Sequence, residues 1–289
     1  MRRLLILHCG PMKTGSTVIQ DTLRFHRQAL FSLGISFYHV RAKSLQSDLE
    51  KIISGEELLG NRVVLLSSEF FCQKSPRVLR DLLSGFNGEC HAILISRPLR
   101  EVYPSLYLQN LKGSRKRITS FRYFLDRQVE IDLMVPGNIG GQLMNAPVLD
   151  ARLSEAGCQT HWIRYDRDFL LNSFFGCLEE IAGISLSHLP EAGLGKPLGL
   201  SPRRSLRMEF AGIARVVNCL NRSSIISNAI REKLFVLMLD MSEYFNRAFG
   251  LRSPLTRYQR QRCDEIDRLV NHAFLDQFCG GSFEKQKSL

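Results

Sequence analysis

The sequence predicts a three-layer α/β fold, a parallel sheet flanked by helices on both faces, with a helical C-terminal extension. Short unbroken apolar runs recur along the first 185 residues, as buried parallel strands require. Segments with apolar residues every three or four positions alternate with these runs, which is typical of βα units. Beyond residue 205 only the helical pattern remains. We therefore expect one domain over residues 1–289, with an α/β core at 1–185 and a loop and helical extension at 186–289.

Each predicted strand of the core is followed by a predicted helix. The expected strands are Leu4–His8, Val63–Leu66, Ala92–Ile95 and Cys158–Tyr165. The expected helices run from Ser16 to Gly34, over Pro76–Phe86, from Leu99 to Leu111, and over Val148–Glu155 and Phe169–Ile181.

Two long loops interrupt this order. Residues 133–147 are rich in Gly, Pro and Asn, and the segment is long enough to serve as a lid over a site. Residues 187–204 separate the core from the extension, where we expect helices near Leu206–Leu220, Ala229–Phe249 and Arg257–Phe278.

Composition restricts the protein class. Hydrophobic residues make up 44% of the chain and charged residues 23%, so a globular protein with a sizeable core is expected. The 39 Lys and Arg exceed the 28 Asp and Glu by +11, which favours an anionic partner without choosing among nucleic acid, a membrane surface and a phosphate or sulfate compound.

The N-terminus and the cysteines indicate where in the cell the protein is expected. The apolar run between Arg3 and His8 is too short for a signal or an integral membrane segment, although peripheral membrane contact stays open. The 8 cysteines include no CxxC pair. We expect buried free thiols in a reducing, cytoplasmic compartment.

An anion-binding loop is predicted between the first strand and the first helix, at Gly10–Thr17 (GPMKTGST). Backbone amides of such a loop and of the helix start converge on an anion, and the helix dipole adds to the attraction. Gly10 and Gly15 have the spacing of the ATP-binding loop GxxxxGK[ST], but Ser16 stands where that loop has lysine, and the lysine lies earlier, at Lys13. The ligand should therefore differ from ATP.

KTGST after a first strand resembles the 5′-phosphosulfate loop of sulfotransferases that use 3′-phosphoadenylyl sulfate (PAPS). After the third strand, Arg97 is followed by Ser105 and Tyr107, the spacing with which those enzymes bind the 3′-phosphate. Residues 4–185 resemble bacterial sulfotransferases acting on glycans, in the segments HCGPMKTGSTVIQDTLRFHRQAL, VVLLSSEFF and AILISRPLREVYPSLYLQNLK. Pro98 departs from the Asp of many relatives, and Val102 replaces a second Arg.

The resemblance implies a P-loop-type fold and a sulfotransferase that moves the sulfuryl group from PAPS, without a metal, to a hydroxyl of a saccharide or glycolipid. Lys13 would neutralise the leaving phosphate. The remaining nucleotide contacts would come from Thr14 and Gly15 through their backbone, Ser16 and Thr17 through hydroxyls and amides, and Arg97 with Ser105 at the 3′-phosphate. We expect Pro104 in the first turn of its helix, which would leave Ser105 near exposed amides.

Two residues compete for the role of general base. Glu69 follows the strand VVLLSS directly, at the edge where open α/β sheets bind ligands, and the resemblance places a catalytic Glu there. His8 ends the first strand beside the loop and is either a base or a core histidine bonded to the loop backbone.

Other functions remain open from sequence alone. A P-loop nucleoside or small-molecule kinase would need a lysine after Gly15 and carboxylates for Mg²⁺. A nucleic-acid or membrane-binding module has only the charge in its favour. Two basic clusters either contact the nucleotide or the acceptor, or lie in solvated turns. They are Arg115, Lys116 and Arg117, and Lys196, Arg203 and Arg204.

Overall fold

The computed structural model describes residues 3–10, 14–40, 45–53, 61–112, 120–134, 145–166, 168–186, 189, 210–249, 255, 257–272 and 274–276. The chain divides into two compact units. The first holds residues 1–97, 131–198 and 268–289, and the second holds 98–130 and 199–267. Both units draw on segments before and after residue 185, and each is described below by itself.

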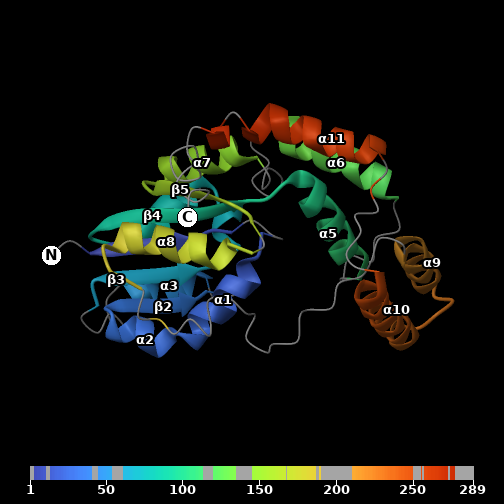
Figure 1. The fold of residues 1–289 in the computed structure, drawn as a ribbon, viewed down its shortest axis with the longest axis horizontal. Helices are drawn as coiled ribbons and strands as arrows, with labels where there is room; N and C mark the ends of the chain where they lie inside the picture. Colours follow the sequence, from blue (N-terminus) through green and yellow to red (C-terminus); the bar gives the residue numbers. More distant parts are fainter. Residues whose placement is uncertain are drawn as a thin grey trace. The chain divides into compact units, whose positions relative to one another are not determined.

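A parallel sheet of five strands forms the centre of the first unit (Figure 1). Its strands are β1 (Leu4–His8), β2 (Ile35–His39), β3 (Val63–Ser67), β4 (Glu89–Ser96) and β5 (Gln159–Arg164), in the spatial order β2-β3-β1-β4-β5. All four neighbouring pairs are parallel. The predicted α/β class and parallel sheet are confirmed, and β1 lies at the centre.

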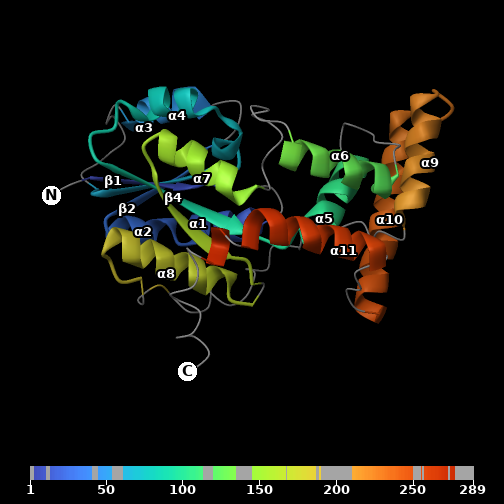
Figure 2. The ribbon, with the colours of Figure 1, turned by 90° about the horizontal axis from the view of Figure 1, so that it is seen from above.

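Helices cover both faces of this sheet (Figure 2). One face carries α1 (Ser16–Phe25), α2 (Arg27–Ser32) and α8 (Leu170–Ala182), and the other carries α3 (Leu45–Ile53), α4 (Pro76–Leu83) and α7 (Ala146–Glu155). The helix expected from Ser16 to Gly34 is two helices that meet at His26. A 3₁₀ turn, η1 (Phe71–Gln73), follows β3.

The face under α1, α2 and α8 buries an apolar cluster. Ile6 of β1, Leu65 of β3 and Ile93 of β4 pack there with Leu23 of α1 and Phe174 of α8, all fully buried. This packing holds the start of α1 at the carboxyl ends of the strands.

The second unit is helical. It contains α5 (Leu99–Lys112), residues 121–130 of α6 (Phe121–Met134), α9 (Ala211–Arg222), α10 (Asn228–Phe249) and α11 (Arg257–Asp267). Buried Asn218 donates to the backbone oxygen of Leu111 at 2.9 Å and accepts from Arg231 Nε at 2.8 Å. The helices expected in the extension are present, and α5 from the middle of the chain packs with them.

Two further observations complete the fold. The π-helical turn η4 (Arg268–His272) returns to the first unit, where Asn271 Oδ1 accepts from the Ala146 amide at 3.0 Å. Across the described ranges, no helix combines the length and apolar character needed to cross a membrane.

Candidate anion-binding site

The segment between β1 and α1 contains Gly10 and Gly15. Gly15, immediately before α1, has φ 88°, a left-handed conformation that favours glycine. A Cβ at Gly15 would also lie 2.4 Å from Leu170 Cδ2. The start of α1 therefore lies tightly against α8, with no room for a side chain.

Polar atoms converge on the α-carbon of Gly10. An ideal Cβ there would lie 2.3 Å from Ser16 Oγ, 3.2 Å from His8 Nε2 and 3.3 Å from Thr14 Oγ1. His8, Thr14 and Ser16 are all buried. We call these four residues the Gly10 cradle.

Two atoms of the Gly10 cradle lack a hydrogen bond. His8 Nε2 and Ser16 Oγ are buried, and neither has a partner among the residues that the structure describes. A buried polar atom without a hydrogen bond lowers the free energy of unfolding by about 1–3 kcal/mol. In addition, α1 begins with no side-chain cap and no acidic residue in its first turn. The cradle therefore suits an anion that accepts hydrogen bonds.

His8 is held from behind by a buried network. Its Nδ1 lies 2.8 Å from Ser67 Oγ, which also accepts from Gln20 Nε2 at 3.1 Å. Since that hydroxyl accepts from Gln20, its own hydrogen is free to point at Nδ1, and we assign the imidazole proton to Nε2, inside the cradle. Burial, and secondarily the nearby His39, lower the pKa of His8 to about 3. His8 is thus a neutral N–H donor at physiological pH.

This burial should make the fold sensitive to acid. Because the pKa of His8 drops from 6.5 to about 3 on folding, the unfolded chain binds a proton that the folded chain does not bind between these pH values. The contribution of His8 therefore lowers the free energy of unfolding as pH falls below 6.5, by up to about 1.4 kcal/mol per pH unit. Urea denaturation at several pH values should show a shallower acid slope for His8→Gln, whereas His272→Gln, at an exposed position, should follow the wild type. Identical slopes for His8→Gln and wild type would contradict this expectation.

Helix α1 extends the polar contacts from the cradle across the sheet. Ser16, Gln20 and Arg24 are spaced by four residues and share one face of the helix. Gln20 bonds Ser67 at the end of β3, and Arg24 Nη2 donates to Nδ1 of His39, at the end of β2, at 2.9 Å.

The strand ends that receive these contacts are level with one another. His8 pairs in register with Ser67, and Ser67 pairs with His39. The three side chains therefore form one line at the carboxyl edge of the sheet, on the face covered by α1.

Glu69 lies at the same edge. It follows β3 by two residues and is half-buried, between buried Ser68 and the η1 turn with its buried Phe71. The Phe70 amide donates to Ser68 Oγ at 3.3 Å, which shapes the turn that carries Glu69. Since β3 is the neighbour of β1, Glu69 follows the strand next to the one that ends at His8. Its role as base stays a prediction.

Arg97 follows β4, the other neighbour of β1. Its guanidinium carbon lies 4.4 Å from the ring centroid of Tyr165, whose amide donates to the backbone oxygen of Ser96 at 2.7 Å. The same ring comes within 3.3 Å of the Cβ position of Gly15. Tyr165 thus connects Arg97 to the anion loop, a contact that sequence reasoning missed because Tyr165 was expected only to end a strand.

The predicted surroundings of Ser105 are wrong. Pro104 lies inside α5 and not in its first turn, so half-buried Ser105 is not beside the helix N-terminus. The helix begins at Leu99 because the Leu99 amide donates a hydrogen bond to the Asp267 carboxylate at 2.7 Å. Arg97 belongs to the first unit and Ser105 to the second, and their joint binding of a 3′-phosphate stays a prediction.

The other predicted residues divide into two groups. Thr17 is half-buried in the first turn of α1, next to the Gly10 cradle. Outside the described residues lie Lys13, the clusters 115–117 and 196–204, and the greater part of the two loops 133–147 and 187–204.

A scan of the sequence against models of protein families finds no match, and a search of curated proteins also finds no match. We therefore infer the function from the geometry of the site and from the motifs.

Proposed function

We propose that the protein is a PAPS-dependent sulfotransferase whose acceptor is a hydroxyl of a saccharide. The Gly10 cradle carries this proposal. Two buried polar groups that have no hydrogen-bond partner in the described part of the chain, His8 Nε2 and Ser16 Oγ, lie at the start of α1, after the central strand of a parallel sheet. That combination suits the 5′-phosphosulfate of PAPS, and Ser16 in place of a lysine argues against a nucleoside triphosphate.

The remaining assignments come from the motif resemblance. Arg97 would bind the 3′-phosphate, and its packing on Tyr165 supports this because stacking fixes the plane of the guanidinium beside the anion loop. Lys13, inside the loop, would supply the positive charge at the leaving phosphate.

The proposed reaction is a single in-line displacement. The acceptor oxygen forms a bond to sulfur as the bond from sulfur to the 5′-phosphate oxygen breaks, and that oxygen keeps the electron pair. Glu69 takes the proton of the acceptor hydroxyl, so the products are the sulfate ester and adenosine 3′,5′-bisphosphate (PAP). His8 and Ser16 hold the phosphate oxygens and exclude water from them.

The first test is nucleotide binding. PAP should bind at least about tenfold more tightly than AMP in calorimetric titrations with EDTA present, because only PAP offers a 3′-phosphate to Arg97. Arg97→Ala should remove most of this difference, whereas Arg77→Ala, at an exposed position of α4, should preserve it. Equal affinity of the wild type for PAP and AMP would exclude the 3′-phosphate assignment, and no binding of PAP would exclude the function.

A further inference from the structure

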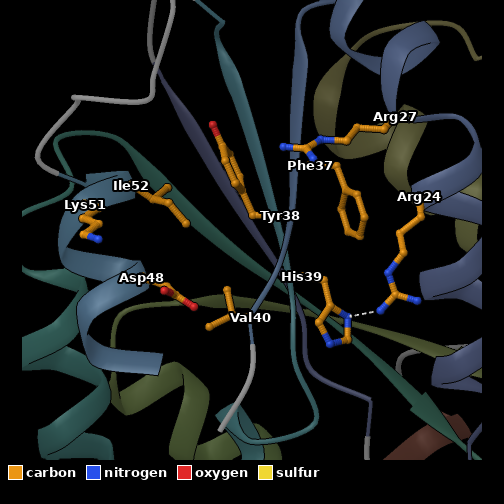
Figure 3. A pocket seen from close by; sticks show the side chains of 9 residues that line it. All are labelled: Arg24, Arg27, Phe37, Tyr38, His39, Val40, Asp48, Lys51 and Ile52. Atoms are coloured by element: carbon orange, nitrogen blue, oxygen red, sulfur yellow. Dashed lines mark hydrogen bonds between the residues drawn. The ribbon is translucent and has the colours of Figure 1, made fainter. Parts of the chain in front are cut away.

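A second polar site lies at the free edge of the sheet. A cavity of about 370 Å³ is lined by Arg24 and Arg27, by residues 37–40 at the end of β2, and by Asp48, Lys51 and Ile52 of α3 (Figure 3). We call it the β2 pocket. Its volume falls within the range of about 300–1,000 Å³ that small-molecule sites occupy. None of the nucleotide assignments above uses it.

The β2 pocket has an excess of positive charge. Arg24 and Arg27 line one side, Lys51 comes from α3, and Asp48 is the one carboxylate among the described residues that line the cavity. Arg24 also pairs with Asp21, and Arg27 lies 5.9 Å from the ring centroid of Tyr38. A ligand with a negative group and neighbouring polar groups fits this lining better than a neutral apolar ligand.

His39 adds a directed donor to the lining. Arginine only donates hydrogen bonds, so the bond from Arg24 Nη2 to His39 Nδ1 requires a lone pair on Nδ1. The neutral ring then carries its proton on Nε2. The polar lining of the β2 pocket thus includes both cations and a hydrogen-bond donor of fixed orientation.

The position of the β2 pocket relates it to the Gly10 cradle. His39 and His8 are level with each other on either side of Ser67, and adjacent strands lie about 4.8 Å apart, so their backbones are separated by roughly 10 Å. Glu69 follows β3, the strand between them. A saccharide that is anchored at the β2 pocket and extends toward the Gly10 cradle therefore passes Glu69, where its hydroxyl meets both the proposed base and the sulfuryl donor.

We propose that the β2 pocket binds an oxyanion of the acceptor, a carboxylate, phosphate or sulfate ester, and that the substrate of the enzyme is therefore an acidic saccharide. Arg27 holds the anionic group, while Arg24 and His39 orient the sugar. This inference rests on the proposed function for the identity of the ligand, but the β2 pocket and the Gly10 cradle have separate residues and can be tested separately.

The test is a titration followed by NMR through the Nε–Hε signals of Arg24 and Arg27, with the protein saturated by PAP so that the Gly10 cradle is occupied. The probes are glucuronate, glucose 6-phosphate and glucose 6-sulfate, with glucose as the neutral control. At least one anionic sugar should shift both arginine signals and bind at least about tenfold more tightly than glucose. Arg27→Gln should lose this preference and keep the affinity for PAP, and Arg77→Gln should keep both.

The outcomes separate the two proposals. If no anionic sugar binds more tightly than glucose, or if Arg27→Gln retains the preference, the assignment of the β2 pocket is overturned while PAP binding stands. If PAP fails to bind, the sulfotransferase proposal fails. The sugar titration is then run without nucleotide, and shifts of the Arg24 and Arg27 signals still decide whether the β2 pocket takes an oxyanion.

Discussion

Glu69→Gln is expected to lower the turnover of sulfation by about 10²- to 10⁴-fold, the usual effect of removing a general base, and to leave the dissociation constant for PAP nearly unchanged. The amide is close in size to the carboxylate but accepts no proton from the acceptor hydroxyl. Because Glu69 is half-buried at the turn after β3 and not inside the Gly10 cradle, its replacement leaves the nucleotide contacts in place. Turnover is measured with labelled PAPS on a confirmed acceptor, and the dissociation constant is measured by calorimetry.

Two further variants and a pH profile make the result specific. Lys13→Ala should damage turnover and nucleotide binding together, and Glu155→Gln, on the exposed end of α7, should change neither. The wild-type rate should fall on the acidic side as the Glu69 carboxylate protonates, and Glu69→Gln should lack that limb. Full turnover by Glu69→Gln would show that the base is elsewhere and would make His8→Asn the next variant to measure.

Gly10→Ala is expected to weaken PAP binding by about 100-fold or more. The added methyl group would lie 2.3 Å from Ser16 Oγ and 3.2 Å from His8 Nε2, so it would push aside the two groups that are proposed to hold the anion. Loss of two hydrogen bonds to a charged ligand, at about 1.5–3 kcal/mol each, accounts for an effect of this size. Calorimetry with PAP measures it.

The matched control is Gly176→Ala, in α8, where a Cβ would meet nothing within 4 Å. This variant should bind PAP as the wild type does and should be slightly more stable, since alanine favours a helix. Thermal unfolding of both variants separates a blocked cradle from a damaged fold. If folded Gly10→Ala binds PAP with wild-type affinity, the anion does not lie at Gly10.

Four of the five strands could be predicted from the sequence, and the fifth could not. β1, β3 and β4 contain apolar runs, which a strand buried among neighbours requires. The edge strand β5, QTHWIR, was predicted without such a run, but the other edge strand, β2, reads ISFYH and was missed. As an edge strand it pairs on one side only, and its last two residues are partly exposed. The β2 pocket was missed for the same reason, since it forms around that strand.

The candidate site was predicted in part. The glycine spacing of the loop indicated an anion site, and the structure adds the buried partners that a local motif does not contain. The spacing of Ser16, Gln20 and Arg24 can be read from the sequence. The contacts of Gln20 with β3 and of Arg24 with β2 depend on the strand order, which cannot. Likewise, Leu99 begins α5 because Asp267 accepts its amide hydrogen bond, 168 residues further along the chain. Such a distant capping residue leaves no local signal for the position of Pro104.

The strand order also affects when the site can assemble during synthesis. β3 inserts between β1 and β2, although it follows both in the chain. A nascent chain that ends before Ser67 contains the whole anion loop, yet His8 has no hydroxyl to fix its ring, and the strand that pairs with both β1 and β2 is incomplete. The loop therefore matures only after β3 has been made and inserted. A ligand that binds only the finished arrangement stabilises it, by about 2.7 kcal/mol at a concentration 100-fold above its dissociation constant, so nucleotide supplied during refolding would favour chains with β3 in place.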